Sequence, residues 1–281
     1  MGIIEYSYID KWNGESIHFE NGYSLYKFFE SISNIIGETT FLFNPSERLL
    51  RIRDMDPSRI CMLDVVFEEN GIVSFNGDLF DSTKEVSLNL EDLAKILKVR
   101  KNDKKEFTFA FGETALIIQK ENKDINTIKT LEYLDLEKEE IPIENLNALK
   151  YDSKVVISKN LLDHFFYESG LYSDVITIEF EKTGIHFKEN GSLGECDTFF
   201  DLLKLEDFRN SNEESTYSLT FLSLLKHFLA IMNKNDTLTI KLKKDTPLKV
   251  KIEFRDISCK VLFYIAPRCE EEDIDYEDEE F

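Results

Sequence analysis

The sequence lacks any continuous apolar run of about 18 residues, so no membrane-spanning helix is expected. Cations are scarce, because 34 lysines and arginines stand against 55 aspartates and glutamates, and the formal net charge is −21. This balance disfavours a nucleic-acid partner unless the basic residues gather on one face. Residues 1–5 carry no basic stretch before an apolar one, so no signal peptide is expected.

Cysteine and histidine are also rare. The four cysteines share no short repeated spacing, and Cys61 and Cys259 lie in apolar, strand-like runs. We therefore expect reduced, partly buried thiols rather than a disulfide framework or a zinc site. The four histidines form no cluster along the sequence, and the common phosphate-binding, dinucleotide-binding, zinc-protease and serine-hydrolase motifs are absent. We therefore expect no catalytic residues, no metal and no cofactor.

One short acidic motif keeps an enzyme alternative open. Asp54-Met55-Asp56 matches the D-x-D pattern that binds divalent metal in some transferases, which leaves a metal-dependent transferase or hydrolase as an alternative. Pro57 directly after it is typical of a turn. His164 and Glu168 are four residues apart on an expected helix, but no third ligand is apparent in the sequence.

The chain contains an internal repeat. A short strand that leads into a helix is expected at residues 87–97, and the same pattern returns at 218–229. An earlier pair of stretches with helical apolar periodicity matches loosely, at 23–36 and 161–172. Strand-like runs follow these stretches at 39–53, 106–118, 175–189 and 237–254. Each half is therefore expected to run helix, strands, helix, strands, which predicts an α+β chain of two similar domains.

Five segments follow from this repeat: an amino-terminal extension at 1–14, a first domain at 15–130, a connector at 131–150, a second domain at 151–268 and an acidic tail at 269–281. The connector is rich in charge but keeps apolar residues, so it is an exposed linker or a docking edge. The tail has no Lys or Arg between residues 270 and 280 and is expected to be disordered. An alternative is that its Tyr276 and Phe281 compete with partners for a binding pocket.

Four short motifs, in order along the chain, resemble the proliferating-cell nuclear antigen (PCNA) family of DNA sliding clamps. Their sequences are closer to those of archaeal clamps. They are Asp54-Met-Asp-Pro-Ser-Arg-Ile60, the connector front at 131–142, Thr246-Pro-Leu248 and Tyr264-Ile-Ala-Pro-Arg268. The resemblance covers residues 15–268. It implies two similar clamp domains per chain, each with antiparallel sheets and two helices. Three chains would close a ring with helices lining the hole and sheets outside.

The resemblance implies double-stranded DNA inside this ring, held by weak phosphate contacts that permit sliding. A ring that is acidic outside and basic inside reconciles this partner with the net charge. The implied DNA-binding residues are cations on or near the helices: Lys95, Lys98, Arg100, Lys101, Lys27, Lys159, Lys226 and Lys234. The helix after Lys159 departs from the family pattern, because it carries Asp163, His164, Tyr167 and Glu168 where clamps usually show cations.

The resemblance also implies a pocket for short peptides of DNA polymerase, flap endonuclease, DNA ligase and the clamp loader. Clamp partners insert one aliphatic and two aromatic side chains, so the pocket must be apolar. The implied pocket residues are Met55, Leu134, Ile141, Pro142, Pro247, Tyr264, Ala266 and Pro267. They converge only if the connector folds over the second domain.

Ring closure would use two edge strands, at about 124–130 and 195–201, in a homotrimer or a heterotrimer. The expected location is the nucleoid-associated cytoplasm for an archaeal protein or the nucleus for a eukaryotic one, with no membrane partner. A second alternative is a clamp-like scaffold or transcription factor that does not encircle DNA. The weakly basic second domain supports it.

Overall fold

The computed structural model describes residues 16–44, 46–70, 72–76, 83–121, 125–137, 141 and 143–268. The amino-terminal extension with Trp12, the tail with Tyr276 and Phe281, and Pro142 of the implied pocket lie outside the described residues. No helix within the described ranges is long and apolar enough to cross a membrane.

The described strands pair into three antiparallel sheets. The first has five strands, in the order β5 (Val73–Asn76), β1 (Ser16–Phe19), β7 (Glu106–Phe111), β8 (Ala115–Glu121) and β9 (Asn126–Glu132). The second has nine, in the order β14 (Glu206–Arg209), β10 (Ser153–Ser158), β16 (Thr237–Leu242), β17 (Leu248–Phe254), β18 (Cys259–Ile265), β4 (Cys61–Glu68), β3 (Leu49–Met55), β2 (Glu38–Asn44) and β6 (Lys84–Asn89). The third has four, in the order β13 (Gly194–Asp201), β12 (Gly184–Gly191), β11 (Val175–Glu181) and β15 (Glu214–Ser218).

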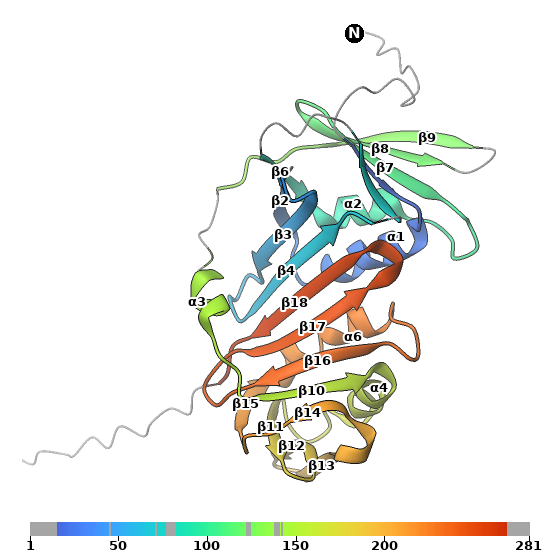
Figure 1. The fold of residues 1–281 in the computed structure, drawn as a ribbon. Coiled ribbons are helices and arrows are strands. Elements are labelled where there is room, and N and C mark those ends of the chain that lie inside the picture. The colour runs from blue at the N-terminus through green and yellow to red at the C-terminus, as the bar shows by residue number, and fades with distance from the viewer. Residues whose placement is uncertain are drawn as a thin grey trace, which may run out of the picture.

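The nine-stranded sheet joins the two halves of the chain. Strand β18, near the carboxyl end, pairs with β4 of the first half from Cys259 opposite Phe67 to Ile265 opposite Cys61. In Figure 1 the sheet runs continuously from the blue strands of the first half to the orange strands of the second. The two halves are therefore joined by backbone hydrogen bonds as well as by side-chain packing.

The main helices cover one face of this sheet. They are α1 (Gly22–Ile32) and α2 (Leu90–Leu97) in the first half, and α4 (Lys159–Glu168), α5 (Leu219–Leu222) and α6 (Leu225–Leu229) in the second. In Figure 1, α1, α2 and α6 lie behind the sheet. The expected order of helix and strands in each half, and hence the α+β prediction, is confirmed.

The first-half helices begin at side-chain caps. Asn21 accepts a hydrogen bond from the Ser24 N–H at 3.1 Å, and Asn89 accepts one from the Asp92 N–H at 2.9 Å. Both contacts satisfy amide groups that have no partner inside a helix. Helix α1 ends at Ile32, earlier than the apolar period to residue 36 predicts. The next apolar residues, Ile35 and Ile36, lie buried in the turn that follows.

Two helix predictions in the second half need correction. The helix expected at 161–172 ends at Glu168, because Gly170 adopts a left-handed φ of 89° and its N–H donates to the buried Glu189 carboxylate. The single helix expected at 218–229 is two short ones, α5 and α6. Neither has a side-chain cap, and the chain turns between them at residues 223–224.

The connector contains a helix that the sequence pattern did not predict. Residues Ile143–Ala148 form α3, which has no buried residue. Glu144 in its first turn interacts favourably with the helix dipole. Apolar periodicity could not indicate α3, because no face of it packs on the core.

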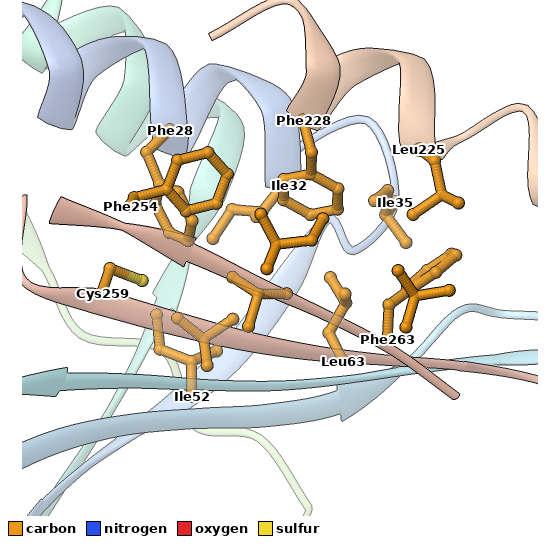
Figure 2. Close-up of a cluster of buried hydrophobic side chains, with 14 of the residues drawn as sticks. Phe28, Ile32, Ile35, Ile52, Leu63, Leu225, Phe228, Phe254, Cys259 and Phe263 are labelled. Atoms are coloured by element: carbon orange, nitrogen blue, oxygen red, sulfur yellow. The ribbon is translucent and has the colours of Figure 1, made fainter. Parts of the chain in front are cut away.

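One hydrophobic core lies between the helices and the nine-stranded sheet. Figure 2 shows Phe28 and Ile32 of α1 beside Phe228 of α6, above Leu63 and Phe263 of the sheet. The Phe28 ring centre lies 5.4 Å from that of Phe67 in the first half and 5.6 Å from that of Phe254 in the second. The two halves therefore bury their apolar surface in common.

The cysteine prediction is confirmed for the described residues. Cys61 and Cys259 are buried, and both are free thiols, as is the partly buried Cys196. Burial raises the pKa of the Cys259 thiol well above its ordinary value, and it raises the pKa of Cys61 as well. Buried neutral thiols of this kind are weak nucleophiles.

Candidate functional site

The strongest basic feature of the helix face lies at the end of α2. Lys98, Arg100 and Lys101 are exposed in the turn after this helix. Lys95, on the helix itself, forms ion pairs with Glu91 at 2.9 Å and Asp92 at 3.2 Å. The charge of Lys95 is thus largely neutralised locally, and the three residues after the helix are the better phosphate ligands.

Further cations in this region were missed by sequence analysis. Lys104 and Lys105 complete the turn, and the Lys120 ammonium donates to the Lys98 carbonyl at 2.6 Å from strand β8. Burial, together with Lys129 and Lys105, lowers the pKa of Lys120. The basic residues within 98–105 are visible in the sequence, whereas the position of Lys120 of β8 beside this turn is not. We call Lys98, Arg100, Lys101, Lys104, Lys105 and Lys120 the basic turn.

Of the other four predicted cations, two already have a carboxylate partner and two are exposed. Lys27 is ion-paired with Glu30, and Lys159 with Asp163. Lys226 and Lys234 are exposed on and after α6, and the Lys226 ammonium lies 5.3 Å from the centre of the Phe166 ring. Cations that already have a carboxylate partner must exchange it to bind a phosphate, so we rank Lys226 and Lys234 above Lys27 and Lys159.

Helix α4 presents an unusual face. Asp163, His164 and Glu168 are exposed, and the Tyr167 side chain is 84% exposed. Its one lysine, Lys159, has its charge balanced by Asp163. The basic surface of the helix layer is therefore concentrated in the first half.

Cations also lie on the face of the nine-stranded sheet away from the helices, and one of them, Lys154, is ion-paired with Asp207. Lys154, Lys241 and Lys249 lie opposite one another on neighbouring strands β10, β16 and β17. Tyr264 continues this row on β18. Burial, then Lys249 and Lys154, lowers the pKa of Lys241. Sequence alone could not place these lysines in a row, because cross-strand neighbours depend on register.

An apolar corner forms where β3 and β18 end and β4 begins. Met55 lies opposite Met62, which lies opposite Tyr264, so the three side chains share the face away from the helices. Tyr151 donates to the Pro247 carbonyl at 2.9 Å, and the Ala266 N–H donates to Ile60 at 2.9 Å. These contacts bring most of the second-domain pocket residues to one place. Ala266 and Pro267 are partly exposed there.

The Tyr264 hydroxyl is a notable feature of this corner. The side chain is 2% exposed, and its oxygen has no hydrogen-bond partner among the described residues. Burial and the nearby Asp64 raise the pKa of Tyr264 to about 12, so the phenol stays protonated at neutral pH. A buried donor of this kind is costly unless a ligand accepts from it.

The connector approaches the first domain rather than the second, contrary to the expectation. The Leu134 N–H donates to the Ser87 carbonyl on edge strand β6 at 2.9 Å. A groove of about 400 Å³ follows, which we call the connector groove. Its lining residues are Glu38, Thr40, Leu42, Arg51, Arg53, Asp54, Glu85, Leu136, Glu137 and Ile141. Of the predicted pocket residues that the structure describes, only Ile141 lines it.

A charged cluster lies between the connector groove and the apolar corner. Asp64 is 5% exposed and pairs with Arg51 and Arg53, each at 3.1 Å. Both arginines also line the connector groove. The predicted pocket is thus divided between the apolar corner and a largely charged connector groove, with this ion cluster between them. No sequence pattern indicates this cluster, because its members become neighbours only through the pairing of β3 with β4.

The acidic D-x-D motif forms a turn. Asp56 is 6% exposed, and one of its carboxylate oxygens accepts from the Ile60 and Cys61 N–H groups. The other accepts from the Ser58 N–H at 2.9 Å. Asp54 accepts from the Met55 N–H at 2.8 Å. Asp56 therefore stabilises the β3–β4 connection. Because its carboxylate is already engaged by backbone N–H groups, the Asp54–Asp56 pair is a poor metal site, which disfavours the metal-dependent transferase or hydrolase alternative.

Two sheet edges are open at opposite ends of the described molecule. Strand β9 is the edge of the five-stranded sheet and β13 the edge of the four-stranded one, close to the two edge strands that the family resemblance implies. They lie at the top and bottom of Figure 1. Phe199 on β13 is 42% exposed, and Leu203 just after it is 89% exposed. An open edge with exposed apolar side chains favours pairing with another chain.

Comparison with known proteins agrees with this architecture. Residues 16–140 match the family model of the proliferating cell nuclear antigen N-terminal domain, and residues 145–268 match that of the C-terminal domain. Two related α+β domains in tandem define a clamp-type protein. Since the two models together cover most of the chain, this chain belongs to the proliferating cell nuclear antigen family.

Relatives and solved structures extend over most of the chain. The DNA polymerase sliding clamp of Pyrococcus abyssi is 26% identical over 258 residues, which are 91% of this chain and 98% of the relative. The PCNA structure from Thermococcus kodakaraensis has a TM-score of 0.77 at 23% identity, covering 90% of this chain and 100% of that one. A. fulgidus PCNA bound to the C-terminal region of FEN-1 has a TM-score of 0.76 at 20% identity, covering 92% and 100%.

Proposed function

We propose that this protein is a DNA sliding clamp. Three copies close a ring around duplex DNA and tether polymerase, flap endonuclease and ligase, which raises their effective concentration at the DNA. An ATP-driven clamp loader opens the ring. The role is non-catalytic, and the protein acts beside DNA, in the nucleoid or the nucleus. The domains span 15–130 and 151–268.

One observation carries the proposal. The basic turn lies at the end of α2, on the helix layer, and the two open edges β9 and β13 lie at opposite ends of the molecule. Pairing β9 of one copy with β13 of the next places the helices of successive copies on the same side. A repeated heterologous contact of this kind gives a ring when its rotation closes.

Topology is the direct test of this function. A loaded ring should stay on nicked circular DNA and slide off after one cut that linearises it. We expect retention on the circle and release within minutes from free linear ends, measured by gel filtration of labelled protein loaded with its clamp loader. Equal retention on both DNA forms would contradict encirclement.

The basic turn gives a quantitative prediction. The triple variant K98Q/R100Q/K101Q should weaken DNA binding of the unloaded ring and flatten its salt dependence. Each lost phosphate contact lowers the log–log salt slope by about 0.9, so the full loss is about 3. Fluorescence anisotropy of a labelled duplex between 50 and 200 mM salt, about the range where such contacts matter, measures both effects.

The control carries the same charge change elsewhere. Lys150, Lys182 and Lys244 are exposed and belong to the connector and the second half. K150Q/K182Q/K244Q should leave the salt slope within experimental error of the wild type. If the two triple variants flatten the slope equally, the interaction reflects net charge rather than the basic turn.

The same fold offers a site for partner peptides. We assign it to the apolar corner together with the connector groove, with the Asp64 cluster between them. A partner packs apolar side chains on the partly exposed Met55, Ala266 and Pro267, beneath which Met62 and Tyr264 are buried. The extended partner backbone runs along the connector at Leu136 and Ile141.

Ile141 allows a focused test of the groove. It is partly buried and lines the connector groove. I141D removes apolar contact and adds a carboxylate beside the acidic lining, so affinity for a flap-endonuclease carboxyl-terminal peptide should fall at least about tenfold, or about 1.4 kcal/mol. Anisotropy of the labelled peptide measures it. L203D, at an apolar residue outside the groove, is the matched control, and equal losses in both variants would refute the assignment.

The scaffold alternative also has a specific observation in its favour. The exposed face of α4 offers carboxylates, an imidazole and a phenol instead of cations. A protein that never holds DNA needs no basic second half. The comparison of circular with linearised DNA separates the two functions, because the retention of a scaffold that does not encircle DNA does not depend on free DNA ends.

A further inference from the structure

Three chemistry-bearing side chains meet on the polar face of the five-stranded sheet. His18 on β1 lies opposite Thr108 on β7, and Glu106 on β7 lies opposite Glu121 on β8. The neighbours Phe19 and Phe107 are buried on the other face, so the alternation of strands puts His18 and Glu106 together. These residues are far apart in the sequence and none belongs to a recognisable motif.

The distances among these groups suit a metal ion. One ligand atom from each of His18, Glu106 and Glu121 lies within 4.8 Å of the others, and His18 Nε2 is 3.4 Å from Glu106 Oε2. Two ligands about 2.0–2.1 Å from a tetrahedral zinc ion lie about 3.3–3.4 Å apart. The first pair therefore already has the required spacing, and the third ligand needs only a small side-chain adjustment.

The surrounding side chains orient the ligands. His18 Nδ1 is 3.1 Å from the Thr108 hydroxyl, which leaves Nε2 directed at the carboxylates. Gln119 donates its amide Nε2 to Glu121 at 2.8 Å. Outer hydrogen bonds of this kind fix the ring and carboxylate of metal sites. Thr108 and Gln119 are 8% and 5% exposed, so both are held by their surroundings.

A second observation points to a missing ligand. The Gln119 Oε1 atom is buried and has no hydrogen-bond partner among the described residues. It belongs to the same amide that holds Glu121. A metal-bound water is a good donor, and one beside Glu121 would satisfy this oxygen.

The electrostatics favour a cation at the same place. Glu106 and Glu121 are direct cross-strand neighbours of like charge, an arrangement that destabilises a sheet. Lys120 does not neutralise them, because its ammonium is bonded to the Lys98 carbonyl. A divalent ion would turn this repulsion into a link between β1, β7 and β8.

We propose that His18, Glu106 and Glu121 bind one divalent transition-metal ion of the zinc class, with water completing the shell. One imidazole and two carboxylates are nitrogen and oxygen donors that suit Zn²⁺ better than Mg²⁺ or Ca²⁺, which prefer oxygen alone. The ion is structural and stabilises the sheet whose edge strand is β9. The proposal is independent of the clamp function.

The test titrates the full chain, first stripped with EDTA, with ZnCl₂ in competition with a chromogenic chelator. We expect one tight Zn²⁺ per chain, at least tenfold weaker binding in H18Q and E121Q, and about tenfold weaker binding in T108V, which keeps all three ligands. H164Q is the matched control. It removes an exposed histidine that stands beside Asp163 and Glu168, and it should bind zinc as the wild type does.

Thermal unfolding provides a second readout that separates binding from misfolding. Without metal, E121Q should melt at or above the wild-type temperature, because the Glu106–Glu121 repulsion is gone. With Zn²⁺, only the wild type, H164Q and, less strongly, T108V should gain stability. Equal zinc affinity in the wild type and H18Q, loss of affinity in H164Q, or equal stabilisation by Mg²⁺ would overturn the proposal.

Discussion

Thr130→Pro should leave a folded monomer and abolish the ring. The Tyr133 N–H donates to Thr114 across the β8–β9 pair, and hydrogen-bonded residues alternate along an antiparallel ladder. The Thr130 N–H therefore points away from β8, toward the open edge. Proline there removes an outward donor while sparing the ladder to β8, and edge positions of this type tolerate proline.

The expected consequence for assembly is large, because the proposed ring closes through the pairing of this edge with β13. We expect native mass spectrometry to show a trimer for the wild type at micromolar concentration and a monomer for T130P. The T130P variant should also fail to remain on circular DNA, because a monomer cannot encircle it. Phe199 on β13 has its N–H outward by the same alternation, since the Leu202 N–H donates to Thr183, so F199P should give the same monomer.

Thr130→Val is the matched control, because it keeps the backbone donor and suits a strand. It should assemble as the wild type does. A trimeric T130P would refute the edge contact. A wild-type chain that is monomeric alone and assembles only with sister subunits would refute the homotrimer while preserving the edge pairing.

Phe28→Ala should destabilise both halves of the molecule together. The ring lies within 6.3 Å, between ring centres, of Phe228 on α6, in addition to its contacts with Phe67 and Phe254. Figure 2 shows it at the junction of α1 with the second-half side chains. Removing a fully buried phenylalanine leaves a cavity and costs about 3–5 kcal/mol. The measurement is urea unfolding followed by both circular dichroism and fluorescence.

The expected curve is one shifted transition, because the halves share a sheet and a core. F199A, which deletes the same side chain from a 42% exposed position, should change the free energy of unfolding by no more than about 1 kcal/mol. Two separate transitions, with only one of them shifted by F28A, would contradict a common core.

The sequence by itself determined the local elements and their order. Leu25, Phe28, Phe29 and Ile32 recur with the helical period, and the same strand-to-helix pattern appears in both halves. Burial of one face of a helix or strand produces a repeating apolar pattern among residues that are close in the sequence, so this pattern can be recognised without the tertiary structure. The turn at Asp56-Pro57 was predictable from neighbouring residues as well, whereas the role of the cations after α2 and the two edge strands were implied by the family resemblance.

Only the tertiary structure decided which of these residues interact. It laid the connector along β6 and put Asp64 between two arginines. It also brought His18 to Glu106 and Glu121. These neighbours depend on strand order and register between distant segments. A one-residue shift in register would turn every side chain to the other face, so no local pattern can specify them.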